Sequence, residues 1–368
     1  MSTSRRALIA GLAAAGLTAC ASGQEDPPTR RERWRELRKA RREARTDPAP
    51  PAGAYGSGYQ AAAKYSADRF GVSMLVMQAA TGKILFEDYP APDGGQDKGW
   101  ELASGTKSFT GVMAGAASAD GFLSIDEKAA DTLSEWRDDA GLSRITIRHL
   151  LSLSSGLAIA GPAARPPPYA QAVRDARLAH EPGTVFEYGP EPFQVFGEIL
   201  QRKLKAKELP ADPSVWLQQR VFDRIGVRPS DWKRGADGNP FMPQGAHFTA
   251  RNWAGFGKWV FEGAPSLDPA VYRALFASSP ANPGYGLSWW MLRPGLKGPN
   301  PRAGVNAETI GSFAMQEDIV MAAGAGFQRL YLCRKRSLVV VRQANQIIAQ
   351  MRAGTPFKDG EFLETLFG

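Results

Sequence analysis

Residues 100–116 read Trp-Glu-Leu-Ala-Ser-Gly-Thr-Lys-Ser-Phe-Thr-Gly-Val-Met-Ala-Gly-Ala. The apolar residues of this stretch recur at the i, i+3, i+4, i+7 spacing of an amphipathic helix, at Phe109, Val112, Met113 and Ala116. Ser104 and Lys107 lie three residues apart in the expected first turn, so they share a face with Cβ atoms about 5–6 Å apart. A hydroxyl and an amine placed in this way can act as a nucleophile and its activating base. The unpaired N–H groups of a helix N-terminus can also receive a developing oxyanion.

A lysine must lose its proton before it can act as a base. A free lysine has a pKa of about 10.4, so a neutral amine at pH 7 requires about 4.6 kcal/mol of bias from the protein. Burial supplies a bias of this size, and the positive end of the helix adds to it. The catalytic interpretation therefore predicts a desolvated pocket around Lys107.

The pattern Ser-x-x-Lys is weak evidence by itself. A second copy, Ser230 to Lys233, follows a proline and has no apolar periodicity after it, so we expect a polar loop there. For Ser104 the competing interpretation is an N-cap serine with an exposed lysine one turn later. The rest of the chain must decide between the two interpretations.

The composition of the 368-residue chain is that of a globular protein, with 43% hydrophobic and 22% charged residues. Residues 30–45 hold nine Arg or Lys and three Glu, which accounts for +6 of the net charge of +8. The remainder is nearly neutral, so no nucleic-acid partner is indicated. The two cysteines and three widely spaced histidines form no metal-ligand pattern, and no apolar run reaches the length of a transmembrane helix.

The first 55 residues are expected to serve export and attachment. A basic start and an apolar stretch ending in Leu17-Thr-Ala-Cys20 predict a lipoprotein signal peptide over residues 1–19, with Cys20 as the lipidated residue. A plain secretory signal with an incidental cysteine is the alternative. Residues 20–55 are expected to form a tether whose Arg-rich segment is either a solvated spacer or a patch pressed onto anionic lipid. These features predict a protein that is lipid-anchored in the bacterial cell envelope, on the periplasmic side.

Residues 56–368 are expected to form one domain with a helical insertion at about 120–265. A β-hairpin is predicted over residues 71–90 and a second one over residues 328–342, with a further strand over residues 285–292. Helical periodicity dominates between them, and a closing helix is indicated near Phe362. Strands at both ends with helices between them imply one sheet that both ends of the chain build.

Several stretches resemble the β-lactamase-related serine hydrolases, which include class C β-lactamases, DD-peptidases, related esterases and 6-aminohexanoate-oligomer hydrolases. They are Leu102 to Phe109, Asp120 to Asp126, Ile145 to Gly156 and Pro182 to Tyr188. The stretch Ala322 to Tyr331 resembles the esterase and oligomer-hydrolase branch. The resemblance runs from about Gly71 to the C-terminus. It implies an α/β (α+β) fold of the serine β-lactamase and penicillin-binding-protein type, with an antiparallel sheet flanked by helices and a helical subdomain.

The resemblance also implies roles for single residues. Ser104 matches the acylated nucleophile, Lys107 the helix-borne base and Tyr188 the tyrosine that shuttles the proton. Ala325, expected on the strand after Gly324, matches the residue whose N–H joins that of Ser104 in the oxyanion hole. A hole built from main-chain donors does not depend on side-chain identity.

Two departures from the family pattern bear on the substrate. The family's Tyr-x-Asn reads Tyr188-Gly-Pro190 here, so the amide that holds a substrate carbonyl is absent and the position of Tyr188 is open to question. The family's Lys-Thr-Gly or His-Thr-Gly strand reads Ala-Ala-Gly324, so no cation is available for a substrate carboxylate. Both departures argue against efficient turnover of β-lactams or D-Ala-D-Ala.

Two residues are assigned to substrate binding, Gly324 and Trp289. The tryptophans Trp289 and Trp290 should point to opposite faces of a strand, so at most one of them lines a pocket. The sequence thus predicts a serine hydrolase that cleaves a small ester or amide without metal or cofactor. The alternative is a catalytically silent or slowly acylating penicillin-binding-like module at the cell envelope.

Overall fold

A computed structural model describes residues 56–159, 165–299, 305, 307–345 and 356–368 of the chain. The predicted signal peptide, the lipidation of Cys20 and the tether with its Arg-rich segment lie outside these residues. The domain boundaries expected for the catalytic part stay predictions. No helix in the described part of the chain has the length and apolar character needed to cross a membrane.

A six-stranded antiparallel sheet forms the centre of the domain, with the strand order β2-β1-β9-β8-β7-β6. Its strands are β1 (Gly71–Gln78), β2 (Ile84–Asp88), β6 (Trp290–Met291), β7 (Ile319–Gly324), β8 (Gln328–Cys333) and β9 (Leu338–Ala344). Both predicted hairpins are confirmed, as β1–β2 and β8–β9. The first strand pairs with the last, with Leu75 opposite Val341, so both ends of the chain build the sheet as expected.

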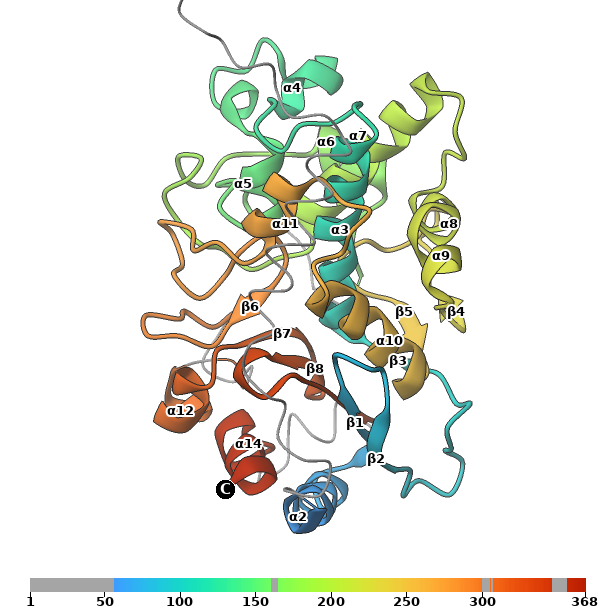
Figure 1. Ribbon diagram of the computed structural model, residues 1–368. Helices are drawn as coiled ribbons and strands as arrows, with labels where there is room; N and C mark the ends of the chain where they lie inside the picture. The colour runs from blue at the N-terminus through green and yellow to red at the C-terminus, as the bar shows by residue number, and fades with distance from the viewer. Residues whose placement is uncertain (1–55, 160–164, 300–304, 306, 346–355) are drawn as a thin grey trace, which may run out of the picture. The chain divides into compact units, whose positions relative to one another are not determined.

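Helices cover the two faces of the sheet, as Figure 1 shows. On one face lie α2 (Gly56–Ala67), α12 (Ala307–Gln316) and α14 (Asp359–Phe367), and on the other lies α10 (Ala250–Phe261). Alternation along β8 explains this division, because Leu330 lies against Gly257 of α10 whereas Tyr331 stacks on Phe362 of α14. The closing helix predicted near Phe362 is confirmed.

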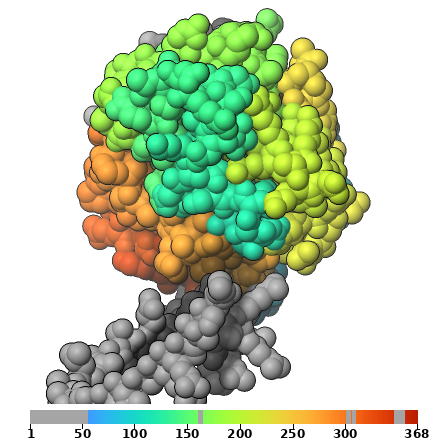
Figure 2. All heavy atoms as spheres, turned by 90° about the horizontal axis from the view of Figure 1, so that it is seen from above, coloured from blue at the N-terminus to red at the C-terminus, as the bar shows by residue number. Residues whose placement is uncertain are grey.

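The middle of the chain is mainly helical, and it forms the end of the domain seen in Figure 2, where its green and teal residues make up most of the visible surface. Its elements are α4 (Ala129–Thr132), η2 (Ser134–Trp136), η3 (Leu142–Arg144), α5 (Ile147–Leu151), α6 (Tyr169–Arg174), α7 (Glu191–Ala206), α8 (Pro213–Leu217), η4 (Gln218–Phe222), α9 (Asp223–Ile225) and α11 (Pro269–Leu275). A long helix, α3 (Lys107–Ala119), runs from this helical end to the sheet (Figure 1). The short 3₁₀ turn η1 (Ala103–Thr106) precedes it and packs against β7.

Two expectations from the sequence are wrong in detail. The strand expected over residues 285–292 is reduced to β6, because the chain folds back on itself, bridging Tyr285 to Trp290 with Ser288 at φ 69°. The polar loop expected around Ser230 contains a strand, β4 (Asp231–Trp232), in a small sheet of order β3-β5-β4 with β3 (Trp100–Glu101) and β5 (Ala246–Phe248). Its strand β3 lies directly before η1 in the chain, and the bond from Leu102 N to the Ala246 carbonyl helps to fix where that turn begins.

Candidate active site

Ser104 lies in the 3₁₀ turn η1, one turn before the α-helix begins at Lys107. Ala103, directly before it, adopts φ 45°, a left-handed conformation that costs energy for a residue with a Cβ. No side-chain cap hydrogen bond closes the N-terminus of η1 or of α3, so an N-cap role for Ser104 finds no support. The serine is partly exposed, which leaves its hydroxyl accessible to a substrate.

Lys107 is buried, with only 4% of its surface exposed. Its Nζ lies 2.9 Å from Ser104 Oγ and donates a hydrogen bond of 3.0 Å to the carbonyl oxygen of Pro243. The rings of Tyr188 and Phe193 cover it, with centroids 4.8 Å and 5.4 Å from Nζ. Burial lowers the pKa of Lys107 from 10.5 to about 7. The desolvated pocket that the sequence analysis required is therefore present, and a large fraction of the amine is neutral near pH 7.

Tyr188 lies beside Lys107 although Gly189 and Pro190 follow it. Desolvation raises the pKa of Tyr188 to about 12 despite the opposing effect of the neighbouring Ser104 side chain, so the phenol is protonated at neutral pH. Its ring stacks on Trp290, with the two rings 28° apart and their centroids separated by 5.7 Å. Pro190 occupies the N-cap of α7, where its missing N–H costs no helical hydrogen bond. The proline therefore leaves Tyr188 within reach of both Ser104 and Lys107.

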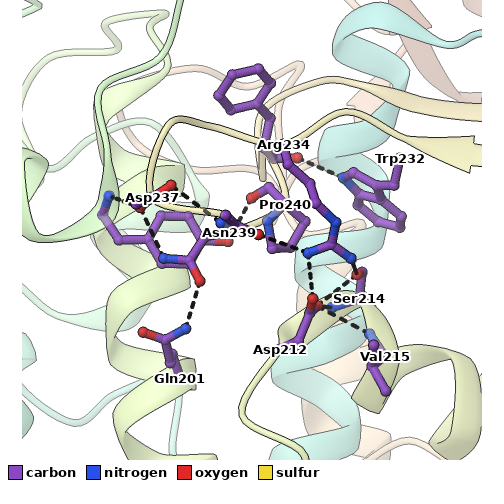
Figure 3. Close-up of polar contacts among 12 residues, drawn as sticks. Gln201, Asp212, Ser214, Val215, Trp232, Arg234, Asp237, Asn239 and Pro240 are labelled. Carbon is purple, nitrogen blue, oxygen red and sulfur yellow. Dashed lines mark hydrogen bonds and ion pairs between the residues drawn. The ribbon is translucent and has the colours of Figure 1, made fainter.

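The loop of residues 233–245, between β4 and β5, brings the carbonyl of Pro243 to Lys107. Figure 3 shows how polar contacts from the helical region hold this loop, among them the bond from Gln201 to Asn239 and the ion pair of Arg234 with Asp212. Further bonds run from Tyr169 Oη to Pro240 O, from Trp232 Nε1 to Phe241 O, and from Met242 N to Gln194 Oε1. Sequence reasoning missed Pro243, because a main-chain carbonyl carries no signature in the residue type.

The end of strand β7 closes the site on the other side. Gly324 packs so tightly on the chain before Ser104 that a Cβ added to it would lie 2.0 Å from the carbonyl oxygen of Leu102. Ala325 is not on the strand, which corrects the expectation, since β7 ends at Gly324 and Ala325 is the exposed first residue of the turn to β8. The two residues thus lie where the main chain approaches the serine turn.

The structure does not bring Trp289 to the site, so its assignment to substrate binding is corrected. Trp289 is fully buried and packs on Phe256 and Phe276. Trp290 is the tryptophan that lies against Tyr188. The two tryptophans have different ring neighbours, but Trp289 precedes β6, so alternation along a strand does not explain this.

The second Ser-x-x-Lys copy has no such geometry. Ser230 Oγ donates to the carbonyl of His247, and Lys233 pairs with Glu101 at 2.7 Å.

A cavity of about 370 Å³ lies at the start of α7, whose first residue, Glu191, follows Tyr188 by three positions in the chain. Its lining residues are Leu157, Ala158, Arg165–Pro168, Gln171, Ala172, Asp175, Ala176 and Glu191. Among the described residues, no group of three or more His, Cys, Asp or Glu side chains is arranged to hold a metal ion.

The chain is similar to known proteins in sequence and in fold. The model of the family described as Beta-lactamase matches residues 60–346. Protein flp of Staphylococcus aureus (strain COL) is 23% identical over 157 residues, which cover 40% of this chain and 32% of that protein, so the match spans about a third of the relative's length.

Two solved structures share the fold at low sequence identity. A Bacillus anthracis protein assigned as a 6-aminohexanoate-dimer hydrolase superposes with a TM-score of 0.62 at 14% identity, covering 83% of this chain and 80% of its own. EstCE1, a hydrolase with promiscuous acyltransferase activity, gives a TM-score of 0.61 at 16% identity and covers 86% and 99% of the two chains.

Proposed function

The chain belongs to the Beta-lactamase family, and from this premise we propose that it is a serine hydrolase that cleaves an ester or an unstrained amide through an acyl-enzyme on Ser104. One observation carries the proposal. A buried lysine, Lys107, whose pKa is lowered to about 7, lies 2.9 Å from the partly exposed hydroxyl of Ser104.

Acylation begins with the neutral Lys107. Its N–H donates to the Pro243 carbonyl, and its lone pair is then free to accept the proton of the Ser104 hydroxyl. As the proton leaves, Ser104 Oγ attacks the carbonyl carbon of the substrate, and the negative charge moves to the carbonyl oxygen. The main-chain N–H groups of Ser104 and Ala325 are proposed to hold this oxygen as the oxyanion hole.

Tyr188 is proposed to carry the proton onward. Its pKa of about 12 keeps the phenol protonated, so it can donate to the leaving group and then take a proton back from Lys107. Water attacks the acyl-enzyme in the second half-reaction. The regenerated neutral Lys107, with Tyr188, takes a proton from this water and delivers it to Ser104 Oγ as the bond between Oγ and the acyl carbon breaks. Ser104 is released together with a carboxylic acid.

The proposed substrates are small uncharged esters and amides. The positions that would offer an amide and a cation to a substrate are occupied by Pro190 and by Ala322-Ala323, which favours neutral acyl groups over β-lactams or peptides with a free carboxylate. The acyltransferase activity named for EstCE1 is compatible with an acyl-enzyme that persists long enough to meet an acceptor.

The proposal is tested with nitrophenyl esters and a fluorophosphonate probe whose attachment site is mapped by mass spectrometry. We expect steady turnover and modification of Ser104, and loss of both in Ser104→Ala and Lys107→Ala. The matched controls are Ser230→Ala and Lys233→Ala, which change the second Ser-x-x-Lys copy and should leave the rate unchanged. Modification of another residue, or of none, would contradict the assignment.

A silent or slowly acylating binding module is the second candidate, favoured by the two altered substrate-binding positions. It predicts a burst of one equivalent of nitrophenol, with no later turnover. Nitrocefin hydrolysis at rates comparable to ester hydrolysis would instead point to an antibiotic-degrading enzyme.

We further propose that the protein is exported and anchored by a lipid on Cys20, aided by the Arg-rich segment of residues 30–45. The test is metabolic labelling with an alkyne-tagged fatty acid, followed by membrane fractionation. We expect label in the natural chain and none in Cys20→Ser, whereas label in both would overturn the assignment of Cys20.

A further inference from the structure

Two buried arginines lie behind the turn that carries Ala325. Arg329 on β8 is directly opposite Arg342 on β9, and their exposed fractions are 1% and 0%. Asp359, at the start of α14, receives two hydrogen bonds from Arg329, of 2.6 Å and 3.0 Å. Like charges opposite each other in a sheet are unfavourable, and buried ion pairs are weak evidence for stability. A stabilising role alone therefore explains this cluster poorly.

Arg329 holds the peptide group that contains the proposed oxyanion donor. Its Nη1 donates to the carbonyl oxygens of Gly324 and Gln328, both at 3.1 Å. The Gly324 carbonyl and the Ala325 N–H belong to one planar trans peptide group and point in opposite directions. A donor that fixes the carbonyl on one side therefore fixes the direction of the N–H on the other. It also polarises the peptide, which makes that N–H a stronger donor.

Arg342 holds the next part of the same turn. Its Nη1 donates to the carbonyls of Gly326 and Phe327, at 3.1 Å and 2.8 Å. Its other nitrogens reach Ser66 Oγ and the Arg69 carbonyl, which ties the turn to the end of α2 and the start of β1. Four carbonyls of residues 324–328 are thus fixed by two side chains that lie behind the turn.

Resting on the proposed function, we propose that Arg329, oriented by Asp359, is the positioning residue of the oxyanion hole. It sets the plane of the Gly324–Ala325 peptide so that its N–H faces the substrate oxygen above Ser104. Arg342 fixes the remainder of the turn. Neither guanidinium touches the substrate, and both act through the main chain.

The test replaces Arg329 together with the groups that bind Asp359 and with Asp359 itself, because removing Arg329 alone would leave a buried carboxylate without its charged partner. The triple variant Arg329→Met, Tyr331→Phe, Asp359→Leu removes the ion pair together with the tyrosine hydroxyl that also binds Asp359. Such replacements by apolar groups are often neutral for folding. We expect kcat for a nitrophenyl ester to fall about 10- to 100-fold, with KM changed by less than about twofold, because the donor acts mainly in the transition state. Affinity for a boronic acid, whose tetrahedral oxygen occupies the hole, should fall in parallel.

The matched control is the double variant Arg336→Met, Glu317→Leu. Arg336 lies in the turn between β8 and β9, and Glu317 lies just before β7, at the opposite end of these strands from the 324–328 turn. That ion pair, at 2.7 Å, is also mostly buried, so kcat should stay within twofold of the natural value. If the triple variant does not fold, Arg329→Lys supplies the test. An ammonium lacks the planar fork with which the guanidinium binds both Asp359 oxygens and the Gly324 carbonyl, so kcat should again fall with KM unchanged.

A folded triple variant or Arg329→Lys with unchanged kcat and boronate affinity would overturn the positioning role. Failure of the natural chain to hydrolyse esters or to label at Ser104 would instead overturn the proposed function itself. The two outcomes are distinguishable because the second is already visible before any arginine is changed.

Discussion

At the scale of single residues, the proposed chemistry depends on the charge of Lys107. Burial has moved its pKa to about 7, whereas an ordinary lysine is almost fully protonated at that pH. The neighbouring carbonyl of Pro243 can accept an N–H in either protonation state, so it orients the amine without requiring the charge. The rings of Tyr188 and Phe193 exclude water that would otherwise stabilise the ammonium.

The first prediction concerns the pH dependence of the rate. Lys107 acts as a base only when neutral, so kcat/KM should rise tenfold per pH unit below about 7 and level off above it. Tyr188 should cause no decrease until pH approaches about 12. The measurement is ester hydrolysis between pH 5 and 10, corrected for spontaneous hydrolysis. A rate that is flat from pH 5 to pH 7 would show that Lys107 does not titrate in this range.

The second prediction concerns stability, and its sign follows from the same pKa. The folded pKa of about 7 lies below the unfolded value of 10.5, so the unfolded chain binds more protons between these two values. Below pH 7 the natural protein bears the full cost of burying the charge, roughly 5 kcal/mol, and this cost declines as the pH rises toward 10.5.

Lys107→Met removes that cost. Its gain in unfolding free energy over the natural chain should therefore be larger at pH 6 than at pH 9, by roughly 2–3 kcal/mol. Urea denaturation of both proteins at the two pH values measures the difference. Lys233→Met, at the exposed second copy, serves as a control whose effect should not depend on pH in this way.

At the scale of elements, three segments that are distant in sequence meet at one point. The turn η1 presents Ser104, the loop 233–245 presents a carbonyl, and the end of β7 presents a glycine. The contact between β7 and η1 is close because Gly324 has no side chain, and the chain before Ser104 occupies the space that a Cβ would need. The geometry of the proposed oxyanion hole is therefore set in part by how these two elements dock.

The third prediction tests this docking with Gly324→Ala. The added Cβ would lie 2.0 Å from Leu102 O and 3.0 Å from Gly105 N, so η1 and β7 must move apart. A shift of about 1 Å in the reacting groups can cost about 100-fold in rate, so we expect fluorophosphonate labelling to slow by about that factor. Gly255→Ala on α10, whose Cβ would meet only Val227 at 3.2 Å, is the control and should label at nearly the natural rate. Equal labelling rates in the two variants would mean that the contact is dispensable.

At the scale of the whole molecule, the features that depend only on the spacing of residues along the chain could be predicted from the sequence. The pairing of Ser104 with Lys107 could be predicted because both lie on one turn, and the alternation in β8 and β9 predicted their hairpin. What depends on long-range register could not be predicted in this way. The placement of Arg329 behind Gly324 and of Pro243 at Lys107 requires strands and loops to dock correctly. The expected strand at 285–292 failed because Ser288 adopts a left-handed conformation that the residue type does not suggest.

The fourth prediction tests whether the two ends of the described domain stabilise each other. Tyr65 of α2 packs on Phe357 and Phe362, with ring centroids 5.7 Å and 6.5 Å away, and its hydroxyl donates to Glu361 at 2.8 Å. The helix α14 also carries Asp359, which holds Arg329. We expect Phe362→Ala to cost about 3–5 kcal/mol, since the side chain is fully buried.

Combined with Tyr65→Ala, Phe362→Ala should show a coupling energy of about 0.5–1.5 kcal/mol in a double-mutant cycle, because the two rings share contacts. The control cycle pairs Phe362→Ala with Phe122→Ala. Phe122 packs on Trp216 of α8, a helix that Figure 1 shows away from α14, so these effects should add to within about 0.5 kcal/mol. Chemical denaturation of the single and double variants gives both cycles. Additivity in the first cycle would mean that α2 and α14 are stabilised independently of each other. The pairing of β1 with β9 would then be sufficient to hold the two ends of the domain together.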